Sequence, residues 1–440
     1  MSKVLKKIKT SFKLIREFGF FNTLRFAWSK IFHTTFIPKI KQETDIHSIR
    51  ALTEARFRNL QPIPSIRIKR EVRRLNVVTD SIASSSLLGG VATALIVATE
   101  FARRNNMSLR IITRTEPVVP KNYVALLKNN GLAPFQKVEF YSDFDRDVMG
   151  KKRHKLEISP TDVFFATSWW SAAAIQKTTI RRRFYYIIQE VETFFYPHGE
   201  EHYLCSKLLQ DENIDYIINS KYLYDYFRTN APQVVKNGVY FNPAFSETIY
   251  NRKTFKKSGK KYKLFFYARP NNPRNMYYYG LQLIDKAVER GILDTKSWDI
   301  YFAGSELKKV QFSNGASTIS QGLMGWKEYA EFLSTTDLTI SLMYTPHPSY
   351  PPYDTACSGG VVLTNRCLNK VEFTECKNII MTDLEEEKFL DGLIQAVELA
   401  KDYPQRQKNF EESSVPRNWN DTLQNTFTFM EERLSCTDLT

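Results

Sequence analysis

LNVVTDSIASSSLLGGVATALIVATEFARRNNMSLRIITR, residues 75–114, holds the pattern that decides the fold. An apolar run at 75–79 is followed by a Ser- and Gly-rich loop, a helical stretch at 91–104 and a second apolar run at 109–114. Two strands separated by a helix predict a βαβ unit, in which the strands lie parallel in one sheet. This stretch therefore predicts an α/β protein.

The same alternation continues along the chain and defines two domains. It predicts a strand with its exit loop at 162–170, and further strands at 138–142, 184–189, 214–220 and 234–241. A polar segment at 241–261 is typical of an interdomain linker. Beyond it, strands are expected at 262–270, 298–304, 338–343, 360–365 and 378–383. We expect two Rossmann-like, doubly wound domains that face each other across a cleft, with ligands at the carboxyl ends of the strands.

These patterns divide the chain of 440 residues into four parts. We expect an N-terminal extension at 1–74, one domain at 75–250, a second at 251–412, and a terminal helix within 413–440 that returns to the first domain. Within the extension, residues 41–74 are expected to form a connector. The length is consistent with about two or three domains.

The composition is that of a globular protein, with 42% hydrophobic and 25% charged residues, which excludes disorder on a large scale. The number of cysteines is odd and no pair has CxxC spacing, so neither a disulfide framework nor a zinc site is expected. The five are Cys205, Cys357, Cys367, Cys376 and Cys436.

The net charge of +15 is concentrated at the N-terminus. Residues 1–74 hold 18 Lys and Arg against 5 Asp and Glu, so the remaining chain is nearly neutral. Residues 1–40 place apolar side chains at helical spacing between lysines, which is typical of a helix that lies in an anionic membrane surface or, alternatively, packs on the body. We expect neither a signal peptide nor a membrane-spanning helix. Because the folded domains are nearly neutral and carry no RNA or DNA motif, no nucleic-acid partner is expected.

Two loops carry groups suited to an anion. Gly89 and Gly90 lie between a strand and a helix, where free N–H groups of the helix N-terminus bind anions; a plain tight turn is the alternative. In FFYARPNNPRN (265–275), Arg269 and Arg274 follow a strand. A guanidinium binds phosphate oxygens bidentately without a metal, although solvated surface arginines remain the alternative.

A third candidate is the stretch SLMYTPHPSYPPYDTACSGGVVLTNR, residues 341–366. Its prolines stiffen the loop that follows a strand. A helix is expected from about Tyr353, and Asp354 within it can accept hydrogen bonds from sugar hydroxyls or simply favour the helix N-terminus. His347 by itself is more often a structural histidine.

Together these motifs resemble a known family. The seven-residue spacing from His347 to Asp354 resembles the paired-acid motif of retaining glycosyltransferases of family 4, which have the GT-B fold. The chain is most similar to the WsaF-type rhamnosyltransferases, through HPSYPP with its SGG turn, YARPNNPRN (267–275) and IIQEVETFFYP (187–197). The resemblance covers roughly residues 75–435.

The resemblance implies a role for each motif. It implies that Arg269 and Arg274, with Gly89 and Gly90, bind the donor diphosphate, and that His347, Arg269 and Asp354 are the catalytic residues. The residues implied to hold the donor sugar and nucleotide are His347, Ser349, Tyr350, Pro351, Asp354 and Leu323. Those implied to line the acceptor side are Trp169, Trp170, Gln189, Glu190 and Glu192.

The sequence also departs from the family pattern. His347 replaces the first acid, which removes a carboxylate that would accept hydrogen bonds, and Asp354 is one methylene shorter than the expected second acid. In the expected base-contacting loop, Leu323 stands where a basic residue would be, and Lys327 is the nearest substitute.

Two strings look like metal sites. Asp143 and Asp145 have the D-x-D spacing that binds divalent metals in another glycosyltransferase fold, and His198 and His202 are spaced i, i+4 in HGEEH. The first lies in a charged loop and the second lacks a third ligand, so no metal site is expected.

The resemblance implies transfer of L-rhamnose from dTDP-L-rhamnose, with retention and without a metal or other cofactor, to a surface polysaccharide or lipid-linked glycan. Such an acceptor implies a cytoplasmic protein at the inner face of a bacterial membrane. The alternatives are a family 4 transferase that uses a UDP-hexose, and a non-catalytic sugar-nucleotide-binding or membrane-surface scaffold protein.

The membrane prediction is tested by sedimentation with anionic vesicles. We expect the full-length protein to sediment with them, less so at high salt, since screening weakens the attraction of lysines to the surface. A version without residues 1–40 is expected to stay in the supernatant. Equal sedimentation of both versions contradicts a membrane role for this segment.

Overall fold

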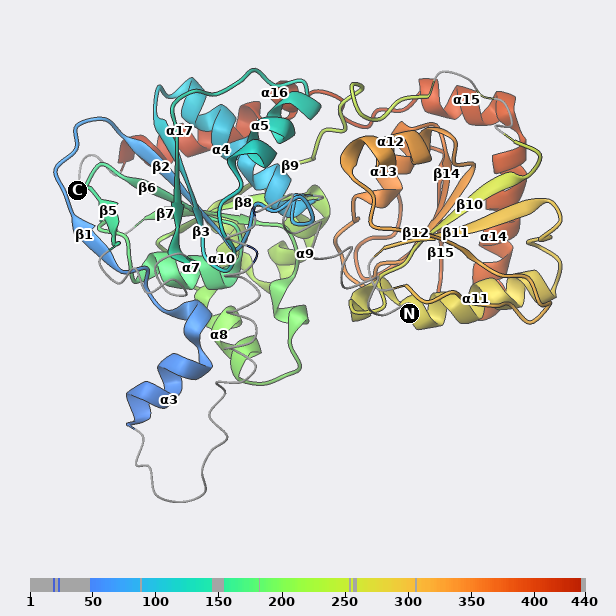
Figure 1. Ribbon diagram of the computed structural model, residues 1–440, viewed down its shortest axis with the longest axis horizontal. Coiled ribbons are helices and arrows are strands. Elements are labelled where there is room, and N and C mark those ends of the chain that lie inside the picture. The colour runs from blue at the N-terminus through green and yellow to red at the C-terminus, as the bar shows by residue number, and fades with distance from the viewer. Residues whose placement is uncertain are drawn as a thin grey trace.

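The structure, a computed structural model, describes residues 19, 23 and 48–436, except 88, 145–153, 182, 253–254, 256–258 and 305–306. Apart from Gly19 and Thr23, the helix expected at 1–40 lies outside the described residues. Figure 1 shows two domains side by side, one formed by the first half of the chain and one by the second.

The N-terminal domain is built on a parallel sheet in the order β4-β3-β2-β6-β7-β8-β9. Helices cover both faces, so the central strands bury nearly every side chain and show continuous apolar runs instead of alternation. The strand order reverses between β2 and β6, which is the switch point of the sheet. The strands are β2 (Arg74–Thr79), β3 (Ser108–Thr113), β4 (Val138–Ser142), β6 (Val163–Ala166), β7 (Phe184–Ile188), β8 (Ile214–Asn219) and β9 (Gly238–Phe241).

Two helical layers enclose this sheet. One core contains side chains of α4 (Gly90–Arg104), α5 (Pro120–Asn129), α16 (Trp419–Thr422) and α17 (Gln424–Cys436). The other contains side chains of α7 (Trp169–Gln176), α8 (Glu200–Leu208), α9 (Lys221–Asn230) and α10 (Pro232–Lys236). Because Phe427, Met430 and Leu434 of α17 are buried in the first core, the C-terminal helix packs on the N-terminal domain, as Figure 1 shows.

The C-terminal domain repeats the plan with the parallel order β12-β11-β10-β13-β14-β15 and a switch point between β10 and β13. Its strands are β10 (Tyr262–Tyr267), β11 (Trp298–Ala303), β12 (Ile319–Gly322), β13 (Leu338–Ser341), β14 (Val361–Asn365) and β15 (Ile379–Thr382). Its helices are α11 (Tyr277–Glu289), α12 (Trp326–Ser334), α13 (Pro351–Cys357), α14 (Glu386–Lys401) and α15 (Tyr403–Glu411). Short 3-10 turns lie at Glu192–Phe195 and Pro273–Asn275. The fold is the doubly wound pair that the sequence predicts.

One expected strand is in part a helix, and the sequence patterns missed several short elements. Residues 41–74 hold the capped helix α3 (Ile49–Arg56), a 3-10 turn at Arg58–Leu60, and β1 (Ser65–Arg67), which pairs with β5 (Leu156–Ile158). The strand expected at 234–241 is helix α10 in its first part, since Pro232 at the first turn favours a helix start. The edge strand β12 was missed because its exposed ISQG sequence has no apolar run.

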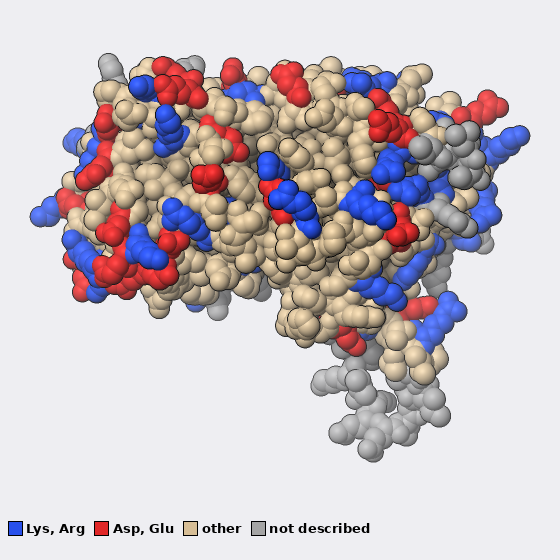
Figure 2. All heavy atoms as spheres, turned by 180° about the vertical axis from the view of Figure 1, so that it is seen from behind, with Lys and Arg blue, Asp and Glu red and all other residues tan. Residues whose placement is uncertain are grey.

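Surface charge on the described residues is mixed. On the face shown in Figure 2, Lys and Arg side chains are interspersed with Asp and Glu over both domains. Within the described part of the chain, every helix is too short or too polar to cross a bilayer.

A buried ion pair holds the C-terminal sheet to α15. Arg406 is fully buried and donates to Asp337 Oδ1 at 3.0 Å and to the Gly359 carbonyl at 2.6 Å. The second Asp337 oxygen accepts the backbone N–H of Lys263 at 2.9 Å. One carboxylate thus joins the starts of β10 and β13 to a distant helix, and Arg252 approaches it to 3.5 Å.

Arg406→Met is expected to lower the free energy of unfolding by about 3 kcal/mol, because removing one partner leaves Asp337 underpaired in the interior. The measurement is denaturant unfolding. Lys408→Met, in the same helix but exposed, is the control and is expected to cost about 0.5 kcal/mol or less. Equal losses in the two variants contradict the role of this pair.

Candidate functional site

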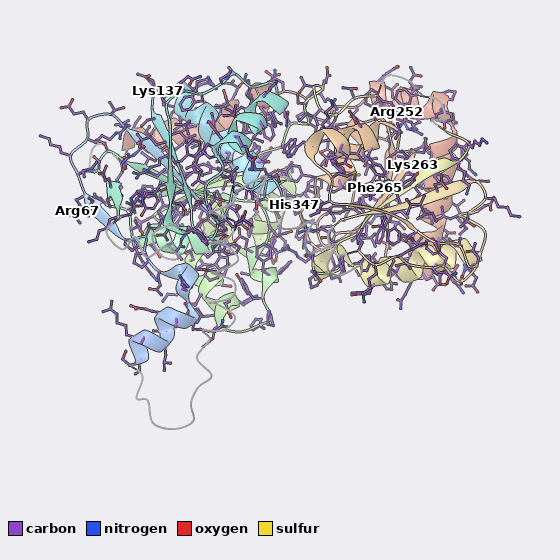
Figure 3. All side chains as sticks on the ribbon, viewed as in Figure 1. Arg67, Lys137, Arg252, Lys263, Phe265 and His347 are labelled. Atoms are coloured by element: carbon purple, nitrogen blue, oxygen red, sulfur yellow. The ribbon has the colours of Figure 1, made fainter. Side chains whose placement is uncertain are left out.

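The two switch points meet at one junction. The first turns of α4, the segment that follows β7 and the end of β8 in the N-terminal domain contact segments that follow β10 and β13 of the C-terminal domain. His347, labelled in Figure 3, lies between the two domains. Since ligands of doubly wound sheets bind at switch points, this junction is the candidate site.

Tyr350 links the domains directly. Its hydroxyl lies 2.6 Å from the Thr93 hydroxyl of α4 and accepts the Asn219 amide at 2.8 Å. A Cβ on Gly89 would lie 4.0 Å from the Tyr350 ring, so this glycine borders the same contact. Ser349, just before Tyr350, is buried with a φ of 66°, a left-handed conformation that turns the chain into α13.

Gln189 packs against Gly90, the second glycine of the loop. Its amide donates to the Gly90 carbonyl at 2.7 Å and accepts from Asn219 at 3.2 Å. A Cβ on Gly90 would lie only 3.1 Å from the Gln189 amide nitrogen, so a glycine permits this approach. The predicted diphosphate loop and the predicted acceptor side are therefore neighbours.

Glu190 and Arg274 form a buried contact across the junction. Glu190 Oε2 accepts the Thr345 hydroxyl at 3.2 Å and lies 3.7 Å from Arg274 Nη1. Burial raises the pKa of Glu190, while Arg274 opposes that rise. The Arg274 guanidinium lies over the Phe195 ring at 4.1 Å from its centroid, a cation–π geometry.

The tryptophans are held by carboxyl groups of their own domain. Glu192 is buried and accepts the Trp169 backbone N–H at 2.8 Å and the Tyr186 hydroxyl at 2.7 Å. Burial raises the pKa of Glu192 to about 7. Trp170 donates its indole N–H to Asp80 at 2.8 Å, directly after β2. Glu192 thus holds the Trp169 backbone from the domain interior. Trp170 lies half-buried at the switch point.

His347 is neutral in this setting. Burial, with Lys370 and Arg274 nearby, lowers its pKa to about 3. Its Nδ1 accepts the Ser349 backbone N–H at 2.9 Å, so the ring proton resides on Nε2. His347 therefore offers a hydrogen-bond donor, in contrast to a carboxylate.

Asp354 lies one turn into α13 and is buried among tyrosines. The Tyr329 hydroxyl approaches its carboxylate at 3.4 Å, and Tyr250 also hydrogen-bonds to it. Burial raises the pKa of Asp354 to about 7, although both hydroxyls oppose the rise. In this structure its partners are protein groups.

The remaining predicted residues differ in exposure. Arg269 follows β10 and is exposed, and within the described residues its guanidinium contacts no acceptor. Leu323 is 49% exposed beside Gly322, whose φ is 66°. Pro351 is buried at the first turn of α13. Arg269 and Leu323 are therefore accessible to a ligand.

The structure adds residues to the site that the sequence motifs missed. They are Thr93, Asn219, Thr345, Phe195 and the fully buried Lys370. Asn219 lies at the end of a predicted strand and Thr345 follows another. Their position at the carboxyl ends of strands could therefore have indicated that they belong to the site. Lys370 gave no such signal, because it follows its strand by five residues.

The two metal-like strings are described only in part. Asp145 lies outside the described residues, while the rings of His198 and His202 are tilted by 32° with their centroids 4.5 Å apart. Among the residues that the structure describes, no three His, Cys, Asp or Glu side chains gather to hold a metal ion.

The fold defines the class of the protein. Similar solved structures include HepE of Anabaena with UDP-glucose (TM-score 0.54, 10% identity, 83% of this chain and 98% of that one) and the sucrose-phosphate synthase of Thermosynechococcus elongatus (0.56, 9%, 83% and 100%). TarM of S. aureus is a third (0.54, 8%, 83% and 99%). At these identities the likeness concerns the fold, which is GT-B.

Family models then assign the chain. The N-terminal domain model of WsaF matches residues 74–221 and its C-terminal domain model matches residues 262–394, together more than half of the chain. The protein belongs to the WsaF family. It is also 24% identical over 206 residues to the O-antigen biosynthesis protein RfbC of Myxococcus xanthus, a match that spans 46% of this chain and 15% of RfbC.

Asp354→Asn is expected to stabilise the protein more at pH 8 than at pH 5. A raised pKa means that the folded state binds the proton more tightly than the unfolded state, so the wild type loses stability as pH rises from about 4 to about 7. The variant lacks this loss. Urea unfolding at both pH values measures it, with the exposed Asp391→Asn as control. A variant effect independent of pH contradicts a buried, protonated Asp354.

Proposed function

We propose that the protein is a glycosyltransferase that transfers L-rhamnose from dTDP-L-rhamnose, with retention, to a growing surface polysaccharide or lipid-linked glycan. Family membership supports the reaction class, and the family resemblance supports the sugar. The observation that carries the proposal is the meeting of both switch points around Arg269, Arg274 and His347.

The cations of the junction suit a diphosphate leaving group. Arg269 is exposed without an acceptor among the described residues, and Arg274 Nη1 is buried without a hydrogen bond. Guanidinium groups fixed in place stabilise the negative charge that develops on the leaving diphosphate. The N-terminus of α4 at Gly90 adds N–H groups from the other domain. We propose that these groups act without a metal.

The acceptor approaches from the N-terminal domain in this proposal. With retention, the acceptor hydroxyl attacks the face of the sugar from which the diphosphate leaves, and a donor phosphate oxygen takes its proton. Neutral His347 donates a hydrogen bond from Nε2 to the sugar, while Asp354 binds the ribose after its tyrosine contacts rearrange. Trp170, Gln189 and Glu190 flank the acceptor.

A UDP-hexose donor is the second candidate. The structure of HepE, which shares the fold, was determined with UDP-glucose. Thymine differs from uracil only by the C5 methyl group, and the exposed Leu323 side chain near the expected base can accommodate either.

The proposed acceptor also implies where in the cell the protein works. An acceptor on a lipid carrier requires a protein that works in the cytoplasm at the inner face of the membrane, and residues 1–40 carry the positive charge for that contact. The match to an O-antigen biosynthesis protein supports a polysaccharide acceptor.

Arg269→Ala is expected to remove most of the thermal stabilisation by dTDP and by dTDP-L-rhamnose, and little of any stabilisation by thymidine. A ligand that binds the native state raises its stability by mass action, so the shift reports the lost diphosphate contact. Transfer from dTDP-L-rhamnose to a lipid-linked glycan is expected to fall at least a hundredfold.

Arg290→Ala is the matched control, because Arg290 is paired with Glu386 and Glu387 at the end of α11. It is expected to behave as the wild type. A panel with UDP, GDP and their sugars ranks the donors in the same assay. Equal losses for dTDP and thymidine contradict the diphosphate role, and a wild type that binds dTDP-L-rhamnose without transferring it to any glycan contradicts catalysis.

A further inference from the structure

Lys370 is a charged side chain placed in the interior by a tight turn. It is fully buried, and Cys367 and Lys370 exchange two backbone hydrogen bonds of 3.0 and 2.9 Å across the turn. Leu368 within the turn is 61% exposed and has a φ of 53°. A bulky residue in the left-handed region is strained, and such strain concentrates at functional sites. Within this turn the leucine is exposed to solvent and the lysine is buried.

The turn is anchored to both domains. The Lys370 ammonium donates to the Met343 carbonyl at 2.8 Å, beside the loop that carries His347. On the other side, Asn369 donates to the Tyr222 carbonyl of α9 at 2.8 Å, and the Tyr222 hydroxyl donates to the Glu372 carbonyl at 2.7 Å. Lys370 is therefore held in place at the junction of the two domains.

The charged groups around Lys370 do not balance. Glu190 and Glu192 are the carboxylates of the cluster, and Glu190 faces the cations Arg274 and Lys370. His347 is neutral, and burial raises the pKa of the Cys367 thiol, which stays protonated. Three cations, Arg274, Lys370 and the nearby Arg269, face two carboxylates, so the cluster holds more positive charge than negative. Buried charge is costly unless it is paired, so this arrangement favours an incoming anion.

One buried nitrogen is available to such an anion. Arg274 Nη1 is buried and has no hydrogen-bond partner, although Glu190 lies only 3.7 Å away. Glu190 instead accepts hydrogen bonds from Thr345 and from the Val191 backbone at 2.9 Å. The charge of Lys370 also acts on Glu190 and so reduces the pull of this carboxylate on Arg274.

We propose that Lys370 is a positioning residue of the donor site: it balances Glu190 across the junction, so that Arg274 keeps a nitrogen for the donor diphosphate. This inference rests on the proposed function. Without Lys370, Glu190 draws Arg274 into a closer ion pair, and the diphosphate loses its buried guanidinium.

The test is calorimetric titration of dTDP into the full-length protein and its variants. Lys370→Met, similar in size, is expected to weaken dTDP at least tenfold, and Lys370→Arg at most threefold. Glu190→Gln in the Lys370→Met background is expected to restore most of the affinity, because the competitor for Arg274 is gone. A merely structural lysine predicts no rescue, since such coupling arises between interacting residues.

A pH series adds a second readout on the wild type. The pKa of Lys370 is lowered to about 8, mainly by burial, so dTDP affinity is expected to fall as pH rises through 8 and Lys370 loses its charge. Lys370→Met is expected to lack this fall. If that variant does not fold by circular dichroism, the wild-type series and Lys370→Arg still decide the matter.

The outcomes separate the two proposals. Unchanged dTDP affinity and an unchanged pH profile in folded Lys370→Met overturn this inference alone, as does a double variant that binds no better than Lys370→Met. A wild type that binds none of dTDP, UDP and GDP overturns the proposed function and this inference with it.

Discussion

The Tyr350 hydroxyl is hydrogen-bonded to Thr93 and to Asn219, two residues from separate elements of the opposite domain. Each parallel sheet presents its loops at the carboxyl ends of its strands, so a joint site exists only where the two sets of loops face each other. The Tyr350 side chain holds the two sets of loops in this arrangement. The Gly89–Gly90 turn, Gln189 and the loop that carries His347 all take their places around this contact.

The chain crosses between the domains twice, and the two crossings lie together. The Phe245 backbone N–H donates to the Pro416 carbonyl at 2.8 Å, and Arg417 donates to the Tyr250 carbonyl. The second crossing delivers α17 to the core of the N-terminal domain. Two adjacent crossings restrict the relative motion of the domains more than a single linker does.

The junction combines neutral and charged groups in a way that suits its proposed chemistry. A buried neutral histidine, tyrosine hydroxyls and buried carboxyl groups lie beside the three cations Arg269, Arg274 and Lys370. In an environment with little water these charges act strongly on a bound diphosphate, because the local dielectric is low. The structure also separates two roles within IIQEVETFFYP: Glu190 faces the other domain, whereas Glu192 turns inward and supports Trp169.

The sequence by itself determined the two doubly wound domains and the loops that form the candidate site, because continuous apolar runs and the glycines and arginines after them are local patterns. It missed β12, whose exposed polar residues leave no such pattern, and it gave no sign of α10 within an apolar stretch. It placed Arg269, Arg274 and His347 after the right strands.

Only the tertiary structure decided which of these groups are buried, which are charged and which face one another. Lys370, Glu190 and Met343 are far apart in the sequence, and the low pKa of His347 depends on burial and on cations from other loops. A local pattern records spacing along one strand or helix. Burial and electrostatic balance depend on neighbours that the fold brings from distant parts of the chain. For that reason the sequence predicted which loops are involved, but not which of their side chains are buried or charged.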